Sequence, residues 1–121
     1  MIAVVEDHAD TAAVLVRLLV RSGLGAKAFN CGPQLFEALQ AGERPALILL
    51  DVQMPEMDGL ECLNAIRSHA QWQTIPVVIF SASFEDKLFQ QAMSLGARAY
   101  VVKGTVSFGK LLDVIRAHAV N

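Results

Sequence analysis

Four short apolar runs, each stopped by a polar or charged residue, constrain the fold of this 121-residue chain. The runs have four or five residues, and segments long enough for a helix separate them. Such runs are typical of strands in a parallel sheet that is buried on both faces. They are Ile2–Val5 before Glu6 and Asp7, Ala46–Leu50 before Asp51, Val77–Phe80 before Ser81, and Ala99–Val102 before Lys103. Because parallel strands end at one edge of a sheet, these polar residues are predicted to converge where open α/β sheets bind ligands.

The composition supports a single buried core. Hydrophobic residues make up 54% of the chain and charged residues 18%, which suits a sheet covered on both faces and argues against disorder. The net charge of −2 gives no general attraction to nucleic acid. No apolar stretch approaches the roughly 20 residues of a membrane span, and no secretory signal is apparent. We therefore expect one cytoplasmic domain over residues 1–121, with Cys31 and Cys62 as buried free thiols.

Helical patterns alternate with the strands and predict five strand–helix units. A weaker second strand is expected at Gly25–Phe29. The expected helices run from Thr11 to Ser22, from Pro33 to near Gly42, from a cap at Asp58 through Leu60, Leu63 and Ile66, from a capping signature at Ser83–Asp86 to Gly96, and from Phe108 through Ile115. Right-handed crossovers then predict the fold class: α/β, a doubly wound, flavodoxin-like, five-stranded parallel sheet of order 2-1-3-4-5, with helices on both faces.

Three carboxylates are expected at the point where this strand order reverses. Glu6 and Asp7 end the first strand, and Asp51 ends the third. Carboxylates within a few ångströms of one another repel, and proteins accept that arrangement when a cation lies among them. Oxygen ligands at a partly open site favour Mg²⁺. The backbone carbonyl of Gln53 would add a further ligand.

Acidic residues at strand ends also serve as helix caps or lie in solvated loops. We favour that simpler interpretation for Asp10 and Asp58. For Asp51 alone the two interpretations are evenly balanced. The acidic pair together with Asp51 and Lys103 argues for a functional site.

The polar residues also form an ordered series of motifs. In chain order they are Glu6 and Asp7; Asp51, followed by Met54, Pro55, Asp58 and Gly59; Ser81 and Ala82; and Tyr100, three residues before Lys103. In this order and at these spacings, they resemble the receiver domain of bacterial two-component response regulators. The resemblance covers essentially the whole chain.

This resemblance implies a phosphorylation-activated signalling switch. Asp51 would be the phosphoacceptor and would take a phosphoryl group from a phosphohistidine of a histidine kinase or phosphotransfer domain. Asp7 and Asp51 would ligate Mg²⁺ together with the carbonyl of Gln53, and Glu6 would act through a metal-bound water. The chain would catalyse its own phosphorylation and slow dephosphorylation without being a turnover enzyme.

The resemblance also assigns roles in transmission of the signal. Lys103 would pair with Asp51 before transfer, and the Ser81 hydroxyl would move in to bind the phosphoryl group. Tyr100 would be the switch residue. Its simpler interpretation is an ordinary half-buried strand tyrosine, and both interpretations can hold. A downstream output domain or protein would bind the last two helices and the fifth strand, where we expect exposed side chains at Lys87, Gln90, Gln91, Arg98, Lys110 and Arg116.

Rival functions stay open at this stage. A flavodoxin-like cofactor domain would need a phosphate-binding loop after the first strand, where this chain has acidic residues instead. A metal-dependent phosphatase would need a second acid or base beside Asp51. The main alternative is a degenerate receiver, which would act as a phosphorylation-independent protein-interaction module. The sequence also leaves open whether the chain is a stand-alone regulator, a fragment of a larger one or part of a hybrid histidine kinase.

The peptide after Lys103 departs from the family, which usually has proline there. The next residue is Gly104, and a cis bond before a residue other than proline costs roughly 2.5–4 kcal/mol. We therefore predict a trans bond, a mobile loop from Gly104 to Ser107, and a Lys103 that still reaches Asp51. His8 is expected to be a loop residue beside the site, His69 a surface residue, and Trp72 a packing residue at the far edge.

Overall fold

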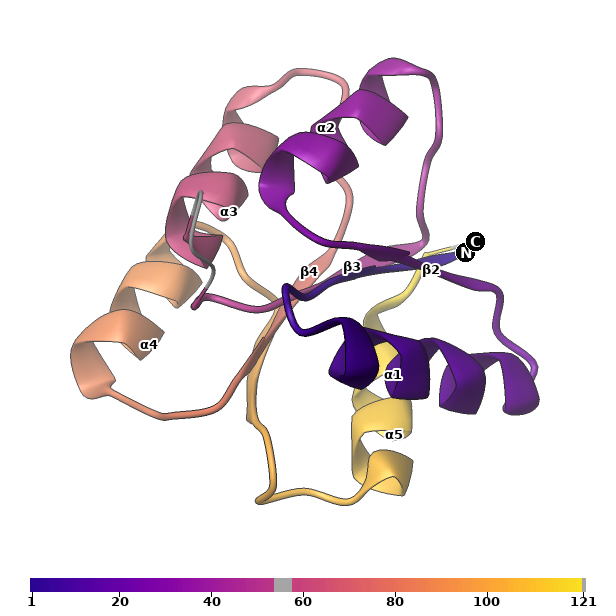
Figure 1. Ribbon diagram of the computed structural model, residues 1–121. Helices are drawn as coiled ribbons and strands as arrows, with labels where there is room; N and C mark the ends of the chain where they lie inside the picture. The colour runs from indigo at the N-terminus through magenta and orange to yellow at the C-terminus, as the bar shows by residue number, and fades with distance from the viewer. Residues whose placement is uncertain (54–57, 121) are drawn as a thin grey trace.

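A computed structural model describes residues 1–53 and 58–120, so Met54 and Pro55 of the motif after Asp51 lie outside the described residues. Strands and helices alternate along the chain (Figure 1). The strands are β1 (Ile2–Val5), β2 (Ala26–Phe29), β3 (Leu47–Leu50), β4 (Val77–Ser81) and β5 (Ala99–Val102). The helices are α1 (Ala9–Arg21), α2 (Gly32–Gln40), α3 (Gly59–Ser68), α4 (Asp86–Ser94) and α5 (Phe108–His118).

The five strands form one parallel sheet of order β2-β1-β3-β4-β5, which confirms the predicted fold. The register aligns the strand ends, because Val5 of β1 pairs with Leu50 of β3 and Leu50 pairs with Ile79 of β4. The residues that follow these strands are therefore neighbours at one edge of the sheet, at the reversal between β1 and β3.

Helices cover both faces of the sheet, with α1 and α5 on one face and α2, α3 and α4 on the other (Figure 1). Alternate residues of β1 point to opposite faces: Ile2 and Val4 pack with α1 and α5, whereas Ala3 and Val5 pack with the other three helices. Both faces are therefore apolar, which explains the uninterrupted hydrophobic runs of the central strands.

Several predicted details at the helix ends differ in the structure. Helix α1 begins at Ala9 instead of Thr11. Asp10 therefore lies in the first turn, where its negative charge interacts favourably with the helix dipole, and it does not cap the helix. The capping signature at Ser83–Asp86 is wrong, because α4 begins after Glu85 and no side chain caps it. The cap of α3 is confirmed, since Asp58 Oδ1 accepts a hydrogen bond of 2.9 Å from the backbone N–H of Glu61.

The far edge of the sheet holds an aromatic stack. The Trp72 ring is buried between Phe36 and His69, with 3.7 Å between the His69 and Trp72 ring centres. The packing role of Trp72 is thus confirmed, but His69 is half-buried by this stack and is not a plain surface residue. Cys31 and Cys62 are free thiols; Cys62 is buried, and Cys31 is only half-buried. None of the described helices has the length and hydropathy to span a membrane.

Candidate phosphoryl-acceptor site

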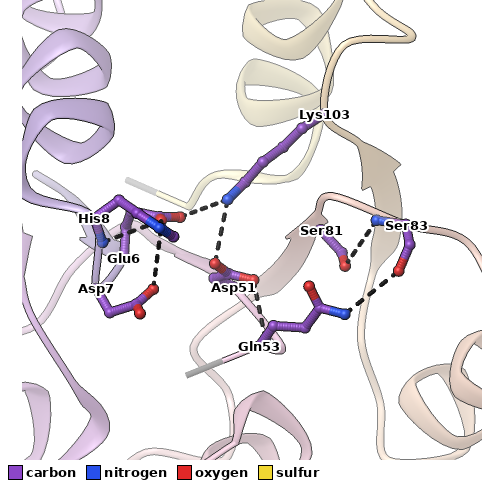
Figure 2. Close-up of polar contacts among 8 residues, drawn as sticks. All are labelled: Glu6, Asp7, His8, Asp51, Gln53, Ser81, Ser83 and Lys103. Carbon is purple, nitrogen blue, oxygen red and sulfur yellow. Dashed lines mark hydrogen bonds and ion pairs between the residues drawn. The ribbon is translucent and has the colours of Figure 1, made fainter. Parts of the chain in front are cut away.

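The carboxyl edge of the sheet holds three buried polar side chains. Glu6 is 2% exposed, Asp51 is 5% exposed and Ser81 is fully buried. They follow or end the adjacent strands β1, β3 and β4, and Lys103 reaches them from the end of β5 (Figure 2). Since an apolar sheet lies behind these groups, their charges interact with little screening by water.

Lys103 bridges the two buried carboxylates. Its Nζ donates hydrogen bonds to Glu6 Oε2 at 2.7 Å and to Asp51 Oδ2 at 3.2 Å (Figure 2). The predicted pairing with Asp51 is confirmed, but the shorter bond to Glu6 was not anticipated from the sequence. Glu6 is thus an ionic partner of the lysine, as Asp51 is.

The loop that carries Lys103 has the predicted backbone. The Lys103–Gly104 peptide bond is trans, and Gly104 adopts a φ of +80°. That left-handed conformation suits glycine, because a side chain there would be strained. The backbone N–H of Lys103 donates to the carbonyl of Ser81 at 2.7 Å, which fixes the start of the loop against β4. The mobility predicted for Gly104–Ser107 stays a prediction.

Both oxygens of Asp51 have a fixed donor. The backbone N–H of Gln53 donates to Oδ1 at 3.0 Å, and Lys103 donates to Oδ2. The Gln53 side chain turns the other way and donates to Ser83 Oγ at 3.5 Å (Figure 2). The Asp51 carboxylate is therefore held by two donors, one at each oxygen.

Burial and charge shift the pKa values of these groups in different directions. Burial raises the pKa of Asp51 above its ordinary value, and the nearby charge of Glu6 adds to this, although the Gln53 N–H and Lys103 oppose it. Burial alone would also raise the pKa of Glu6, but the hydrogen bond and charge of Lys103 outweigh it and leave that pKa lowered. Burial would lower the pKa of Lys103, yet its bonds to Glu6 and Asp51 raise it. Lys103 therefore remains an ammonium, and its charge is shared unequally between the two acids.

Asp7 presents an unsatisfied oxygen. Its side chain is 25% exposed, but Oδ1 is buried and accepts no hydrogen bond from the described residues. The ring nitrogen Nδ1 of His8 lies 3.5 Å from this oxygen and 3.1 Å from Glu6 Oε1. A buried carboxylate oxygen without a donor fits a cation, because only a positive charge or a hydrogen-bond donor offsets its desolvation.

The acidic residues do not all face one another. Donor atoms of Glu6, Asp7 and His8 lie within 4.8 Å of one another, a spacing that suits one metal ion. Asp51 is outside that group, and its two oxygens are held by Lys103 and Gln53. Asp7 and Asp51 lie at the same edge of the sheet but do not form one cluster in this structure, so their shared ligand role stays a prediction.

Ser81 and Tyr100 both connect to the loop after β4. The Ser81 hydroxyl oxygen accepts a hydrogen bond from the Ser83 N–H at 3.4 Å, and the Tyr100 hydroxyl donates to the Ser83 carbonyl at 2.8 Å. The Tyr100 ring is half-buried and packs edge-on against Phe84 and Phe89. Ser83 therefore links the buried hydroxyl to the aromatic residue of β5.

Sequence reasoning missed the contributions of Ser83 and His8. Ser83 was read as a helix cap, and its position two residues after Ser81 was the available signal that it faces the site. His8 directly follows the acidic pair, yet its ring turns back toward both carboxylates (Figure 2). The six side chains predicted to be exposed on the face of α4, β5 and α5 are all exposed: Lys87, Gln90, Gln91, Arg98, Lys110 and Arg116.

Comparison with known proteins agrees with this geometry. The family model described as "Response regulator receiver domain" matches residues 2–116, and the chain belongs to this family. A crystal structure of a response regulator receiver protein from Pseudomonas putida has a TM-score of 0.89 at 23% identity and covers 96% of this chain and 94% of that one, so the fold is shared. A receiver domain is a signalling switch and not a classical turnover enzyme.

Two relatives in sequence are much longer proteins. The chain is 35% identical over 100 residues to the DNA-binding transcriptional regulator NtrC of Proteus hauseri, a match that covers 83% of this chain and 20% of NtrC. It is 32% identical over 120 residues to the sensory/regulatory protein RpfC of Xanthomonas campestris pv. campestris, which covers 98% of this chain and 16% of RpfC. The chain thus spans a fifth or less of the length of these relatives.

Proposed function

We propose that this chain is a phosphorylation-activated switch in which Asp51 accepts a phosphoryl group from a phosphohistidine of a histidine kinase or phosphotransfer domain. The observation that carries the proposal is the state of Asp51: a buried carboxylate whose two oxygens are oriented by Lys103 and by the Gln53 N–H. An oriented carboxylate beside a fixed ammonium suits phosphoryl transfer, where catalysis depends on positioning and on neutralising charge.

The transfer exchanges one bond to phosphorus for another. An Asp51 carboxylate oxygen forms the new O–P bond, the N–P bond of the partner's phosphohistidine breaks, and its electron pair returns to the imidazole. The product is an acyl phosphate on Asp51. Lys103, already 3.2 Å from Oδ2, would follow the added negative charge by pairing with a phosphoryl oxygen.

We propose Mg²⁺ as the metal, held by Asp7, Asp51 and the backbone carbonyl of Gln53, with Glu6 acting through a metal-bound water. The unsatisfied Oδ1 of Asp7 supports this assignment. When bound, such a cation offsets the repulsion between the carboxylates and the incoming phosphoryl group. Among the described residues, Lys103 is the one lysine or arginine paired with any of these three carboxylates, so negative charge exceeds positive charge at this edge of the sheet.

Transmission would run from Ser81 through the loop at Ser83 to Tyr100. Both side chains already bond to the backbone of Ser83, so a movement of the Ser81 hydroxyl toward a phosphoryl oxygen would disturb the Tyr100 contact. The exposed face of α4, β5 and α5 would then present a changed surface to an output domain or protein. We propose residues 1–121 as one receiver domain in the cytoplasm, without direct contact to nucleic acid or membrane.

A phosphorylation-independent interaction module is the second candidate, but nothing in the site favours it. The experiment that separates the two uses phosphoramidate, a small donor with the same N–P bond, in the presence of Mg²⁺. Intact mass spectrometry should show one added phosphoryl group on the wild type and on Asp58→Asn, a control that keeps a good helix cap. Asp51→Asn should show none. An unmodified wild type would support the interaction module, and a modified Asp51→Asn would move the acceptor elsewhere.

A further inference from the structure

We propose that His8 supplies a nitrogen ligand to the cation site, so that transition-metal ions such as Mn²⁺ and Co²⁺ bind more tightly relative to Mg²⁺ than they would to an all-oxygen site. This inference rests on the proposed function only in placing a cation beside Glu6 and Asp7. It adds a metal preference that is set by a residue of this chain.

The imidazole of His8 has no structural task within its own helix. His8 is the N-cap residue of α1, but its side chain caps no backbone N–H of that helix. Its ring turns back toward the acidic pair instead (Figure 2). A side chain that is 76% exposed has many other conformations available, so this orientation reflects attraction to the two carboxylates.

The separations fit a shared ion. Neighbouring ligands of an octahedral ion with bonds of about 2.1 Å lie about 3 Å apart. His8 Nδ1 is hydrogen-bonded to Glu6 Oε1 at 3.1 Å, a bond that a shared ion would replace, and it lies 3.5 Å from Asp7 Oδ1. Asp7 Oδ1 is also the buried oxygen without a hydrogen bond, so an ion at this point would satisfy it. The imidazole nitrogen of His8 and the proposed ligand oxygen of Asp7 thus already have nearly the spacing of two ligands of one ion, with Glu6 beside them.

The addition of an imidazole nitrogen to the oxygen ligands determines which metal ions bind more tightly. Imidazole nitrogen is a good ligand for first-row transition metals, and affinity for them rises from Mn²⁺ to Co²⁺ and beyond. Mg²⁺ prefers oxygen and retains its waters, so it gains little from His8. His8 should therefore separate the affinities for these ions while leaving Mg²⁺ binding almost unchanged.

The test compares the wild type with His8→Ala and with His118→Ala, which removes an imidazole at the far end of α5. Mn²⁺ binding is followed by the electron paramagnetic resonance of free Mn²⁺ in mildly alkaline buffer, and Mg²⁺ binding by competition. We expect His8→Ala to weaken Mn²⁺ binding about tenfold with little change for Mg²⁺, and His118→Ala to change neither. Spin-echo spectra of bound Mn²⁺ should show a directly coupled nitrogen in the wild type that is absent in His8→Ala.

Three results would overturn the inference: equal weakening of both ions in His8→Ala, no weakening at all, or absence of Mn²⁺ binding to the wild type. The first would mean that His8 acts only on the local charge. These outcomes are independent of the phosphoramidate experiment. Wild-type protein that is phosphorylated on Asp51 but lacks the nitrogen signal would retain the proposed function and lose this inference. The reverse pattern would retain the inference alone.

Discussion

The units β3–α3 and β4–α4 are neighbours in the sheet, but they hold their helices in different ways. Helix α3 begins at a side-chain cap, Asp58, and buries Gly59, Cys62, Leu63 and Ile66. Helix α4 begins without a side-chain cap and buries Ala92. Asp51, the proposed acceptor, precedes the firmly held helix, whereas Ser81 and Ser83 precede the loosely held one.

This difference separates two tasks. Phosphoryl transfer needs an acceptor whose position is fixed to a fraction of an ångström, which the packing of α3 against the Asp51 backbone favours. A signal needs an element whose conformation changes at low cost, and elements with few buried apolar contacts are the ones that open most easily. Under the proposed function, the site would therefore join a rigid side that carries the chemistry to a more easily deformed side that carries the output.

The largest expected effect on stability comes from truncating one leucine that packs against the core in each of the helices α3 and α4. Leu63→Ala should lower the free energy of unfolding by about 2–5 kcal/mol, because Leu63 is fully buried and leaves a cavity. Leu88→Ala in α4 should cost only about 1–2 kcal/mol, because Leu88 is half-buried. Urea denaturation of both variants checks this, and equal losses would remove the contrast between the two helices.

A substitution at Gly59 tests how closely α3 approaches the backbone of Asp51. A Cβ at this position would overlap Val52 Cα and lie 2.5 Å from the carbonyl oxygen of Asp51. Gly59→Ala should therefore lower stability by about 1–3 kcal/mol. Gly109→Ala is the matched control in α5, where the nearest atom would be 3.7 Å away, and it should be neutral or stabilise by up to about 1 kcal/mol. Thermal melts of both variants decide the matter, and a well-tolerated Gly59→Ala would show that the contact is loose.

Asp51→Asn tests the electrostatic cost on the rigid side. Burial raises the pKa of Asp51, so its charged form destabilises the native state at neutral pH, and the variant should be more stable than the wild type. The wild type regains stability as the pH falls through the raised pKa, and the gain is complete below the unfolded value. The difference between the two proteins should therefore shrink from pH 7 toward acid. Urea denaturation of both proteins without added metal, at pH 7 and at acidic pH, measures this difference in stability. A difference that grows in acid would contradict a raised pKa for Asp51.

The smallest effects come from the helix caps. Asp58→Ala should destabilise the protein by about 1 kcal/mol, because it removes the acceptor of the Glu61 N–H. Glu85→Asp should stabilise it by about 0.5 kcal/mol, because the N-cap of α4 has an extended backbone but no capping side chain. If denaturation shows no gain for Glu85→Asp, the start of α4 is limited by something other than its missing cap.

The strands and their order were predictable because both faces of the sheet are apolar. Three buried central strands leave an unmistakable hydrophobic run, and each run ends at a residue of the site. Helix starts were less predictable, because a capping pattern such as Ser83–Asp86 indicates only that a cap is available. The structure uses Ser83 as a partner of Ser81, Gln53 and Tyr100 instead.

Within the site, the residue types were predictable from the sequence and their pairing was not. The positions of Asp51 and Lys103 at strand ends implied their contact. The preference of Lys103 for Glu6 depends on side-chain lengths across β1, β3 and β5, which no local pattern records. The orientation of His8 could not be predicted from a local pattern either, because the ring of a residue at the start of a helix can face solvent or turn back toward the preceding strand.

Hydrogen exchange by mass spectrometry, before and after phosphorylation with phosphoramidate, tests the central claim most directly. One sample gives both the intact mass and the protection of each helix, and Asp51→Asn is the unphosphorylated control. We predict one phosphoryl group, altered protection in α4 and β5, and unchanged slow exchange in α3. An unmodified protein, or a change in α3 as large as that in α4, would contradict this prediction.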